Sequence, residues 1–305
     1  MLKSAMEIKA LHKDIGRKNI IKNLSFDIRP GEVFGFIGPN GAGKTTTIRM
    51  MVGLIGITKG DVVIKGHSIK KDYSKAISEV GAIVENPEMY PFMTGWQNLK
   101  HFAGMSNGIT NERINEVVQL VGLENAIKTK VGKYSLGMRQ RLGIAQALLH
   151  KPSVLILDEP TNGLDPAGIR EIRRYIRRLA VEDNVSVIVS SHLLSEIELM
   201  CDRIGVIKNG KLIAIKDLNE EADTEECTVN LEVNPQEEAI EVVRALPNIK
   251  LLDTNERIQI QINRNDIPHL VTTLVQKDVQ VFGVNVAQST LEDRFLEMIG
   301  ENTIE

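Results

Sequence analysis

The sequence predicts an α/β protein built on a parallel β-sheet and followed by a smaller α+β domain. Short apolar runs at 33–37, 153–158 and 185–190 are typical of fully buried parallel strands. A helical periodicity over 166–182 separates the last two runs, and such alternation of strand and helix indicates a parallel α/β core. Beyond residue 218 the composition becomes acidic, and a second series of strands and helices follows.

The remaining elements of the larger domain, residues 1–219, are predicted from turn chemistry and periodicity. Residues 6–30 predict strand segments around the turn Gly16-Arg-Lys-Asn, and residues 60–70 predict another short strand pair. Residues 94–149 have mostly helical periodicity. The domain is expected to end in a hairpin over 206–215.

The second domain is expected at 228–305, after an acidic linker at 220–227. Its elements have the order βαββαβ, which is typical of a ferredoxin-like fold. The predicted strands are 228–233, 249–253, 257–262 and 279–285, and the predicted helices are 236–246 and 265–276. A final amphipathic helix is expected at Leu291–Ile299.

Composition places the chain among ordinary globular proteins. It has 305 residues, of which 42% are hydrophobic and 25% charged. Its two cysteines, Cys201 and Cys227, lie far apart and have no metal-ligand neighbours, so inert thiols are expected. No apolar stretch approaches the roughly 18 residues that a membrane span needs, and no signal peptide opens the sequence. Work at a membrane would therefore require a separate partner.

Charge is distributed unevenly between the two domains. Residues 1–219 contain 31 basic and 22 acidic residues, a net charge of +9. The remaining residues contain 6 basic and 18 acidic residues, a net charge of −12, and the whole chain carries −3. The basic first domain suits a polyphosphate ligand, whereas the acidic second domain argues against nucleic-acid binding.

The most informative motif is Gly38-Pro-Asn-Gly-Ala-Gly-Lys-Thr45, which follows the apolar run 33–37 directly. A glycine-rich loop between a strand and a helix turns its backbone N–H groups toward one anion. Lys44 can then reach the β- and γ-phosphates of a nucleotide, and the Thr45 hydroxyl can ligate Mg²⁺. The motif predicts a nucleotide triphosphate site.

A second nucleotide motif ends the run 153–158. Asp158 closes this apolar run, and Glu159 follows at once. A buried parallel strand presents its last side chains at the carboxyl edge of the sheet. Asp158 is placed to hold Mg²⁺ through water, and Glu159 to polarise an attacking water.

Three further motifs narrow the class of protein. Tyr134-Ser-Leu-Gly-Met-Arg-Gln-Arg141 precedes a helix, and Ser135 is a candidate N-cap whose turn exposes free N–H groups. Gly163-Leu-Asp-Pro166 lies just after Glu159, and Ser190-Ser-His192 ends the following strand.

With these motifs in this order, residues 6–215 resemble the ATP-binding subunit of an ABC transporter. The resemblance implies a P-loop NTPase core with antiparallel β and helical subdomains, the latter at 86–133. It implies a homodimer that holds ATP between the loop Gly38–Thr45 of one protomer and the signature residues of the other. The ATP-binding residues are then Ile15, Gly38, Pro39, Asn40, Gly41, Ala42, Gly43, Lys44, Thr45 and Thr46.

The resemblance also implies roles for residues outside the loop. Glu159 is the catalytic carboxylate, and His192 contacts the γ-phosphate. Asp165 occupies the D-loop position. The signature segment that contacts ATP in trans is Ser135, Leu136, Gly137 and Met138. The metal ligands are Thr45, Glu85 and Asp158.

Three positions depart from the usual family pattern. Glu85 stands where a glutamine is usual, Leu136 where the signature usually has glycine, and Ile15 where an aromatic residue usually stacks on adenine. Since Ile15 has no π-face, weak discrimination between bases is expected. Glu85 together with Tyr134–Met138 looks most like the subgroup that exports bacitracin and lantibiotics.

The sequence thus predicts the cytoplasmic ATPase subunit of an exporter, peripheral at the inner face of the membrane, working with Mg²⁺ and a separate permease. Pro87, Tyr90, Phe92 and Trp96 are candidates for the permease contact. The alternative is a non-transport ABC ATPase with a regulatory C-terminal domain. The single set of motifs and the lack of a heptad run favour the exporter.

Overall fold

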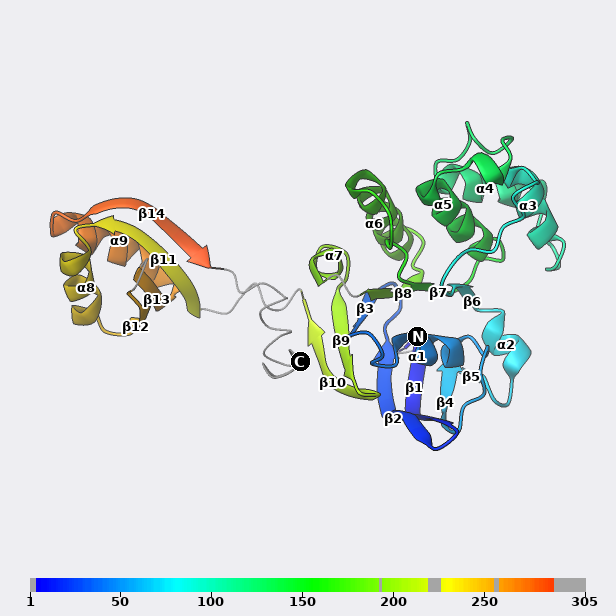
Figure 1. The fold of residues 1–305 in the computed structure, drawn as a ribbon, viewed down its shortest axis with the longest axis horizontal. Helices are drawn as coiled ribbons and strands as arrows, with labels where there is room; N and C mark the ends of the chain where they lie inside the picture. The colour runs from blue at the N-terminus through cyan, green and yellow to red at the C-terminus, as the bar shows by residue number, and fades with distance from the viewer. Residues whose placement is uncertain (1–3, 192–193, 219–225, 255–257, 288–305) are drawn as a thin grey trace. The chain divides into compact units, whose positions relative to one another are not determined.

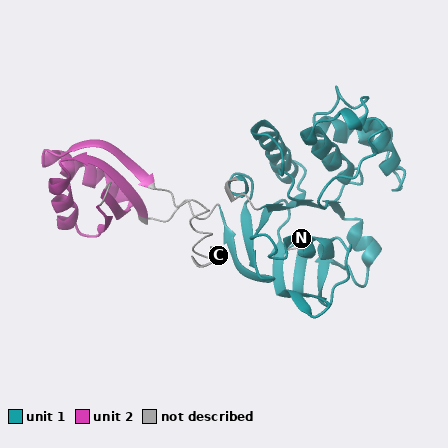
Figure 2. Ribbon diagram, viewed as in Figure 1, with its two compact units in different colours: residues 1–219 teal, residues 220–305 magenta. Residues whose placement is uncertain are grey.

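The computed structural model describes residues 4–191, 194–218, 226–254 and 258–287. The chain divides into two compact units, residues 1–219 and residues 220–305, coloured separately in Figure 2.

A six-stranded sheet forms the centre of the first unit, with the order β10-β9-β3-β8-β7-β6. Strands β9, β3, β8, β7 and β6 run parallel, and β10 pairs antiparallel with β9. The strands are β3 Val33–Ile37, β6 Val80–Ile83, β7 Val154–Asp158, β8 Ser186–Ser191, β9 Arg203–Lys208 and β10 Lys211–Asp217. Every residue of β3, β7 and β8 is buried, as the uniformly apolar runs predict.

A second, antiparallel sheet has the order β2-β1-β4-β5. Its strands are β1 Met6–Ile15, β2 Lys18–Ile28, β4 Lys59–Ile64 and β5 His67–Ser68. Phe26 of this sheet stacks on Phe34 and Phe36 of β3, with ring centroids 5.4 and 5.5 Å apart. Helix α1 (Lys44–Met51) contributes Ile48, Met50 and Met51 to the same core, so the loop before α1 is held by both sheets.

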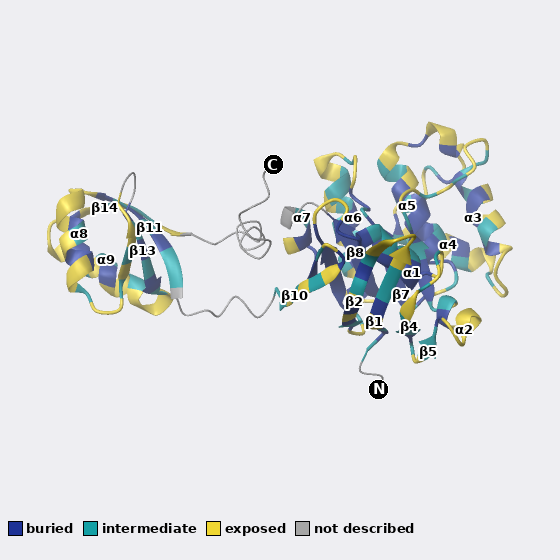
Figure 3. Cartoon of the chain, turned by 60° about the horizontal axis from the view of Figure 1, so that its bottom comes forward, coloured by how far each residue is buried: buried dark blue, intermediate teal, exposed yellow. Residues whose placement is uncertain are grey.

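The helical part of the unit is built from α3 (Gly95–Ala103), α4 (Asn111–Leu120) and α5 (Leu136–Ala147), which gather beyond β6 and β7 (Figure 1). Thr94 begins α3 with a capping box that Gln97 completes, and a short 3₁₀ turn, η1, spans Val131–Lys133. Helices α2 (Tyr73–Ile77), α6 (Pro166–Val181) and α7 (Leu194–Glu198) complete the unit. Helices α3, α4, α5 and α6 combine buried residues with exposed ones (Figure 3).

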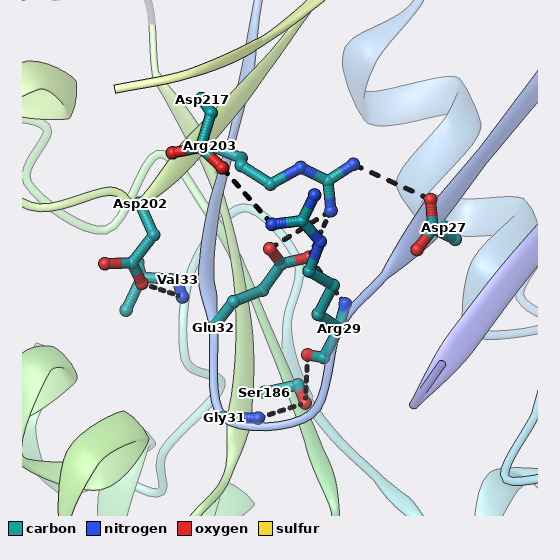
Figure 4. Close-up of polar contacts among 9 residues, drawn as sticks. All are labelled: Asp27, Arg29, Gly31, Glu32, Val33, Ser186, Asp202, Arg203 and Asp217. Atoms are coloured by element: carbon teal, nitrogen blue, oxygen red, sulfur yellow. Dashed lines mark hydrogen bonds and ion pairs between the residues drawn. The ribbon is translucent and has the colours of Figure 1, made fainter. Parts of the chain in front are cut away.

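A buried ionic cluster lies at the amino end of β3 (Figure 4). Glu32 and Arg203 are about 6% and 5% exposed, and Arg203 Nη1 donates to both Glu32 oxygens at 3.1 Å. The Arg29 N–H also donates to Glu32, and Asp27 lies 3.6 Å from Arg203 Nη2. Burial raises the pKa of Glu32, against the opposing effect of the Arg29 N–H and Arg203.

The second unit follows the predicted βαββαβ order. Its elements are β11 Glu226–Asn234, α8 Gln236–Ala245, β12 Lys250–Asp253, β13 Ile258–Asn263, η3 Arg264–Asp266, α9 Ile267–Gln276 and β14 Gln280–Ala287. The strand order is β12-β13-β11-β14, with antiparallel pairing throughout. Buried aliphatic residues such as Val229 and Ile260 from the sheet, Val243 from α8 and Leu270 from α9 form its core.

Most sequence-based assignments agree with these elements. The predicted strand and helix of 153–158 and 166–182 correspond to β7 and α6. The five-residue helices α2 and α7 have no counterpart among the predictions, because so few residues carry too little periodicity. The helix expected at Leu291–Ile299 lies outside the described residues. Among the helices that are described, none combines the length and apolarity needed to cross a membrane.

Candidate nucleotide-binding site

The loop Gly38–Thr45 connects β3 to α1, and its glycines meet steric demands. Gly41 and Gly43 have φ of 77° and 111°, a region that favours glycine. A Cβ on Gly38 would lie 2.3 Å from the Ile207 carbonyl oxygen. Gly43 is the N-cap of α1, so the loop leads into the unsatisfied N–H groups of a helix start. This backbone forms a cradle suited to phosphate.

Lys44 is a buried lysine whose ammonium group points along the loop. Its side chain is 6% exposed, and Nζ donates to the Gly38 carbonyl at 2.7 Å. The nearest carboxylate oxygen, Glu159 Oε1, is 3.9 Å away. Burial lowers the pKa of Lys44, although the charges of Glu159 and Asp158 oppose that shift. A triphosphate bound in the loop would add negative charge beside this lysine.

The end of β7 places two carboxylates beside the loop. Asp158 is buried, and its Oδ1 accepts a short hydrogen bond from the Ser190 hydroxyl. Glu159 has the left-handed φ of 49°, and its N–H donates to Ser190 Oγ at 3.0 Å. Ser190, on the neighbouring strand β8, therefore fixes both residues at the carboxyl edge of the sheet.

A pocket of about 250 Å³ brings the catalytic candidates together. It is lined by Thr45, Glu85, Asn86, Leu136, Gln140, Asp158, Glu159 and Asn162. A second pocket, of about 180 Å³, follows the loop itself and is lined by Ile20, Pro39, Asn40, Gly41, Gly43, Lys44, Thr45, Thr46 and Glu159. Thr45 and Glu159 belong to both, so the two hollows meet at the end of the phosphate cradle.

A larger cavity, of about 580 Å³, lies elsewhere. Its lining includes Ser153 and Ser186, which stand at the amino ends of β7 and β8. It is therefore at the opposite edge of the sheet from the motifs.

Glu85 lines the 250 Å³ pocket, and it pairs with a basic side chain that the sequence analysis does not assign to the site. It follows β6, has a left-handed φ of 69°, and forms a short ion pair with Arg49 Nη2 of α1. Both side chains are partly exposed, at 60% for Glu85 and 41% for Arg49. Glu85 is thus held near the metal candidates by the same helix that begins with Lys44.

The signature segment lies at the start of α5. Ser135 is the N-cap, and its Oγ accepts a hydrogen bond from Met138 N at 3.2 Å. Ser135, Leu136, Gly137 and Asp165 line a separate pocket of about 350 Å³. Asp165 is itself the N-cap of α6 and accepts from Gly168 N at 2.9 Å.

Among the predicted residues that the structure describes, Ile15, Gly38, Ala42 and Met138 line none of these pockets. Ile15 is 54% exposed at the end of β1, whereas Ile20 of β2 lines the loop pocket. His192 lies outside the described residues. Residues that sequence reasoning missed are Ile20, Arg49, Asn162 and Gln140. Gln140 stands within the Tyr134–Arg141 motif, which could have drawn attention to it.

The donor set is compatible with Mg²⁺ that keeps water ligands. Thr45 offers a hydroxyl and Asp158 a carboxylate, the oxygen ligands that Mg²⁺ prefers. Within the described part of the chain, no three His, Cys, Asp or Glu side chains are close enough to hold an ion alone. Mg²⁺ usually keeps several waters and takes further oxygen ligands from nucleotide phosphates.

Comparison with known proteins extends these observations. The ABC transporter family matches residues 21–162. The chain is 55% identical over 300 residues to the uncharacterized ABC transporter ATP-binding protein YhcH of Bacillus subtilis, covering 98% of this chain and 97% of that protein. It is 38% identical to the bacitracin transport ATP-binding protein BcrA of Bacillus licheniformis, covering 96% and 97%. A solved ATP-binding subunit of an ABC transporter matches with a TM-score of 0.64 at 27% identity, covering 71% and 91%.

These relatives confirm the predicted P-loop fold, the nucleotide-binding ATPase class and the resemblance to the bacitracin-type subgroup. The similarity to YhcH extends over 98% of this chain and so includes both units. The chain belongs to the ATP-binding proteins of the ABC transporter family.

Proposed function

We propose that this chain binds and hydrolyses Mg·ATP and drives a separate membrane permease that exports peptide antibiotics or other drugs. The observation that carries the proposal is the convergence of Lys44, Asp158 and Glu159 beside one glycine cradle. Phosphoryl transfer needs a cation beside the phosphates, a carboxylate that holds the metal and a base for the attacking water, and these three side chains can supply them.

Each residue of the nucleotide site has its own role in this proposal. The backbone of Gly38–Thr45 binds the phosphates, and Lys44 neutralises part of their charge. Thr45 and Asp158 hold Mg²⁺, which, when bound, neutralises charge on the phosphate oxygens. Glu159 polarises the attacking water. His192 contacts the γ-phosphate in this proposal.

The signature residues act in a homodimer. Ser135, Leu136, Gly137 and Met138 stand at a helix start whose N–H groups suit an anion. Leu136 is 38% exposed and Ser135 is exposed, so this end of α5 is accessible to the nucleotide held by a second copy. Two copies then enclose two Mg·ATP.

The permease contact involves exposed aromatic residues after Glu85. Phe92 is 64% exposed and Tyr90 39%, with their ring centroids 5.8 Å apart. Exposed aromatic side chains are suitable anchors for a protein partner. Pro87 instead packs toward α5, and Trp96 lines a separate pocket of about 390 Å³. The contact puts the protein in the cytoplasm, at the inner face of the membrane.

The substrate class rests on similarity to the bacitracin transport protein, whose name states its cargo. No nucleic-acid partner is expected, given the acidic second unit.

The test is to express the chain with the membrane protein encoded beside it, purify the two together, and measure ATP hydrolysis and drug resistance. Recovery of a polytopic partner, with ATP hydrolysis and resistance lost together on removing the chain, supports the proposal. Recovery of ribosomes or DNA would instead favour the non-transport alternative.

A further inference from the structure

Arg49 is a charged residue of α1 to which the proposed mechanism gives no role. Its side chain is 41% exposed, and its Nη2 forms a short ion pair with Glu85 Oε1. Among the described residues, neither side chain has another hydrogen bond or ion pair. One oxygen of Glu85 is thus bound by Arg49, and the other oxygen, Oε2, is left for a further partner.

The place of Arg49 on α1 puts this ion pair close to a candidate metal ligand. Thr45 and Arg49 are four residues apart in the helix, so they are neighbours on one face, with Cβ atoms about 5–6 Å apart. Thr45 lines the 250 Å³ pocket, and Glu85 lines it too. A carboxylate that pairs with Arg49 is therefore held about one helical turn from the Thr45 hydroxyl.

The backbone of Glu85 is held near the pocket by packing against α5. Pro87 follows two residues later, and a Cβ on Gly143 of α5 would lie 2.6 Å from Pro87 Cβ. Glu85 itself has the left-handed φ of 69°. With its backbone held in this way, Glu85 can leave the pocket only by turning its side chain, and the ion pair with Arg49 holds that side chain.

The other charges of the pocket show why Glu85 needs such a partner. Asp158 and Glu159 line the same pocket, and like charges at short range repel one another. Glu85 is 60% exposed, so its carboxylate can turn into solvent, where this repulsion is screened. Arg49 opposes that turn, because it fixes one oxygen and adds positive charge beside the carboxylate.

We propose that Arg49 positions Glu85 for Mg²⁺, by binding Oε1 and leaving Oε2 to bind the cation that accompanies the nucleotide. Arg49 is then a positioning residue, because carboxylates that ligate a metal are usually oriented by hydrogen bonds from outer-shell partners. This inference rests on the proposed function. Two explanations oppose it: the ion pair is ordinary surface chemistry, or Arg49 competes with the cation for Glu85.

The experiment compares four variants and one control with the native chain. Arg49→Gln, Glu85→Gln and the double variant form a double-mutant cycle, and Arg49→Lys keeps the charge. Arg178→Gln is the matched control, because it breaks an ion pair with Glu182 of similar exposure, 50% and 61%, that lines none of the pockets described above. The Kd for ATP is measured with Mg²⁺ and with EDTA, and the ratio of the two is the Mg²⁺-dependent gain in affinity.

The proposal predicts that Arg49→Gln reduces this gain about two- to fivefold, or about 0.4–1 kcal/mol, the range for coupling in an exposed ion pair. Loss of a positive charge alone has the opposite sign, because it weakens metal-free ATP more than the less negative Mg·ATP. Arg49→Lys retains part of the gain. In the Glu85→Gln background, Arg49→Gln has no further effect, and Arg178→Gln keeps the native gain.

Three results overturn the inference. An unchanged gain in Arg49→Gln assigns the ion pair to surface chemistry, and a raised gain favours competition with the cation or loss of charge alone. A reduction of the same size in the Glu85→Gln background shows that Arg49 acts without Glu85. In all three cases the native chain still binds ATP. If the native chain binds no ATP with Mg²⁺ or with EDTA, the proposed function itself fails, and this inference fails with it.

Discussion

Buried charged side chains lie near both ends of β3, but they differ in how closely an opposite charge approaches them. At the amino end, Glu32 is matched by Arg203 through two hydrogen bonds of 3.1 Å and by the Arg29 N–H (Figure 4). At the carboxyl end, Lys44 makes its closest contact with a carbonyl, and its nearest carboxylate oxygen is 3.9 Å away.

The difference distinguishes a structural charge from a functional one. A buried ion pair with complete partners stabilises a single arrangement only while both partners are present. A buried cation whose nearest carboxylate oxygen is 3.9 Å away can form a closer ion pair with a bound anion. The cluster at the amino end of β3 is paired within the protein, whereas the site at the carboxyl end is suited to phosphate. Substitutions at the amino end are therefore expected to change stability, and those at the carboxyl end to change nucleotide binding or hydrolysis.

Glu159→Gln should have the largest effect, and only on the functional end. The amide keeps size and hydrogen bonding but cannot act as a base, so turnover should fall by about 10²–10⁴-fold. ATP binding should survive, and an ATP-bound dimer should accumulate. Steady-state ATPase assays and gel filtration with ATP check both results. Near-native turnover in the purified variant would remove Glu159 from the proposed mechanism.

Arg203→Met should affect the structural end alone. It leaves Glu32 buried without its main cation, and breaking a buried pair typically costs about 3–5 kcal/mol of unfolding free energy. The Kd for ATP of the folded protein should not change. Denaturant unfolding measures the first effect and titration the second. The double variant Glu32→Leu/Arg203→Met should recover most of the loss; if it is no more stable than the single variant, the buried charge is not the cause.

Lys44 should give nucleotide affinity a pH dependence at the functional end. Burial lowers the pKa of Lys44 in the free protein, and bound phosphates favour its charged form and raise that pKa. Binding therefore takes up a proton between these two values. Affinity should be highest below the free-protein pKa and fall as pH rises through that range toward the ordinary value of 10.5. Calorimetric titration across this range checks the slope. Lys44→Met should bind more weakly with no such slope, and an equally steep slope in that variant would assign the proton to another group.

The residues beside the nucleotide's base should discriminate weakly between ATP and GTP. Ile15 is largely exposed, and the apolar side chain beside the loop is Ile20, which also cannot stack on a base. Affinity should thus come mainly from the phosphate cradle. GTP is expected to compete with ATP within about tenfold, a difference of about 1.4 kcal/mol. Competition titration decides it, and a hundredfold preference for ATP would point to a base contact outside these residues.

The sequence predicts the parts of the site that depend on local order. Gly38–Thr45 and Asp158 are recognisable because a strand, a loop and a helix start follow one another directly. Gln140 and Arg49 are not, because their significance comes from packing between distant segments, as where Gly143 meets Pro87. Ile20 is not recognisable for a similar reason, since only the pairing of β1 with β2 decides which side chain lies beside the loop.

Glu85 and Arg49 form an exposed ion pair beside the nucleotide-binding site, unlike the buried groups at the two ends of β3. Exposed pairs usually contribute less than about 1 kcal/mol, so breaking this one should hardly change stability. Its expected effect is on coupling. Glu85→Gln keeps a polar side chain near the pocket and should largely keep ATPase activity. Glu85→Ala should separate ATP hydrolysis from transport, because the segment loses its link to α1 and the Mg²⁺ side of the pocket. ATPase activity and drug resistance are measured together in a strain that carries the permease, with Arg49→Gln as the second arm. If Glu85→Ala leaves both properties native, Glu85 is a bystander, and its pairing with Arg49 is ordinary surface chemistry.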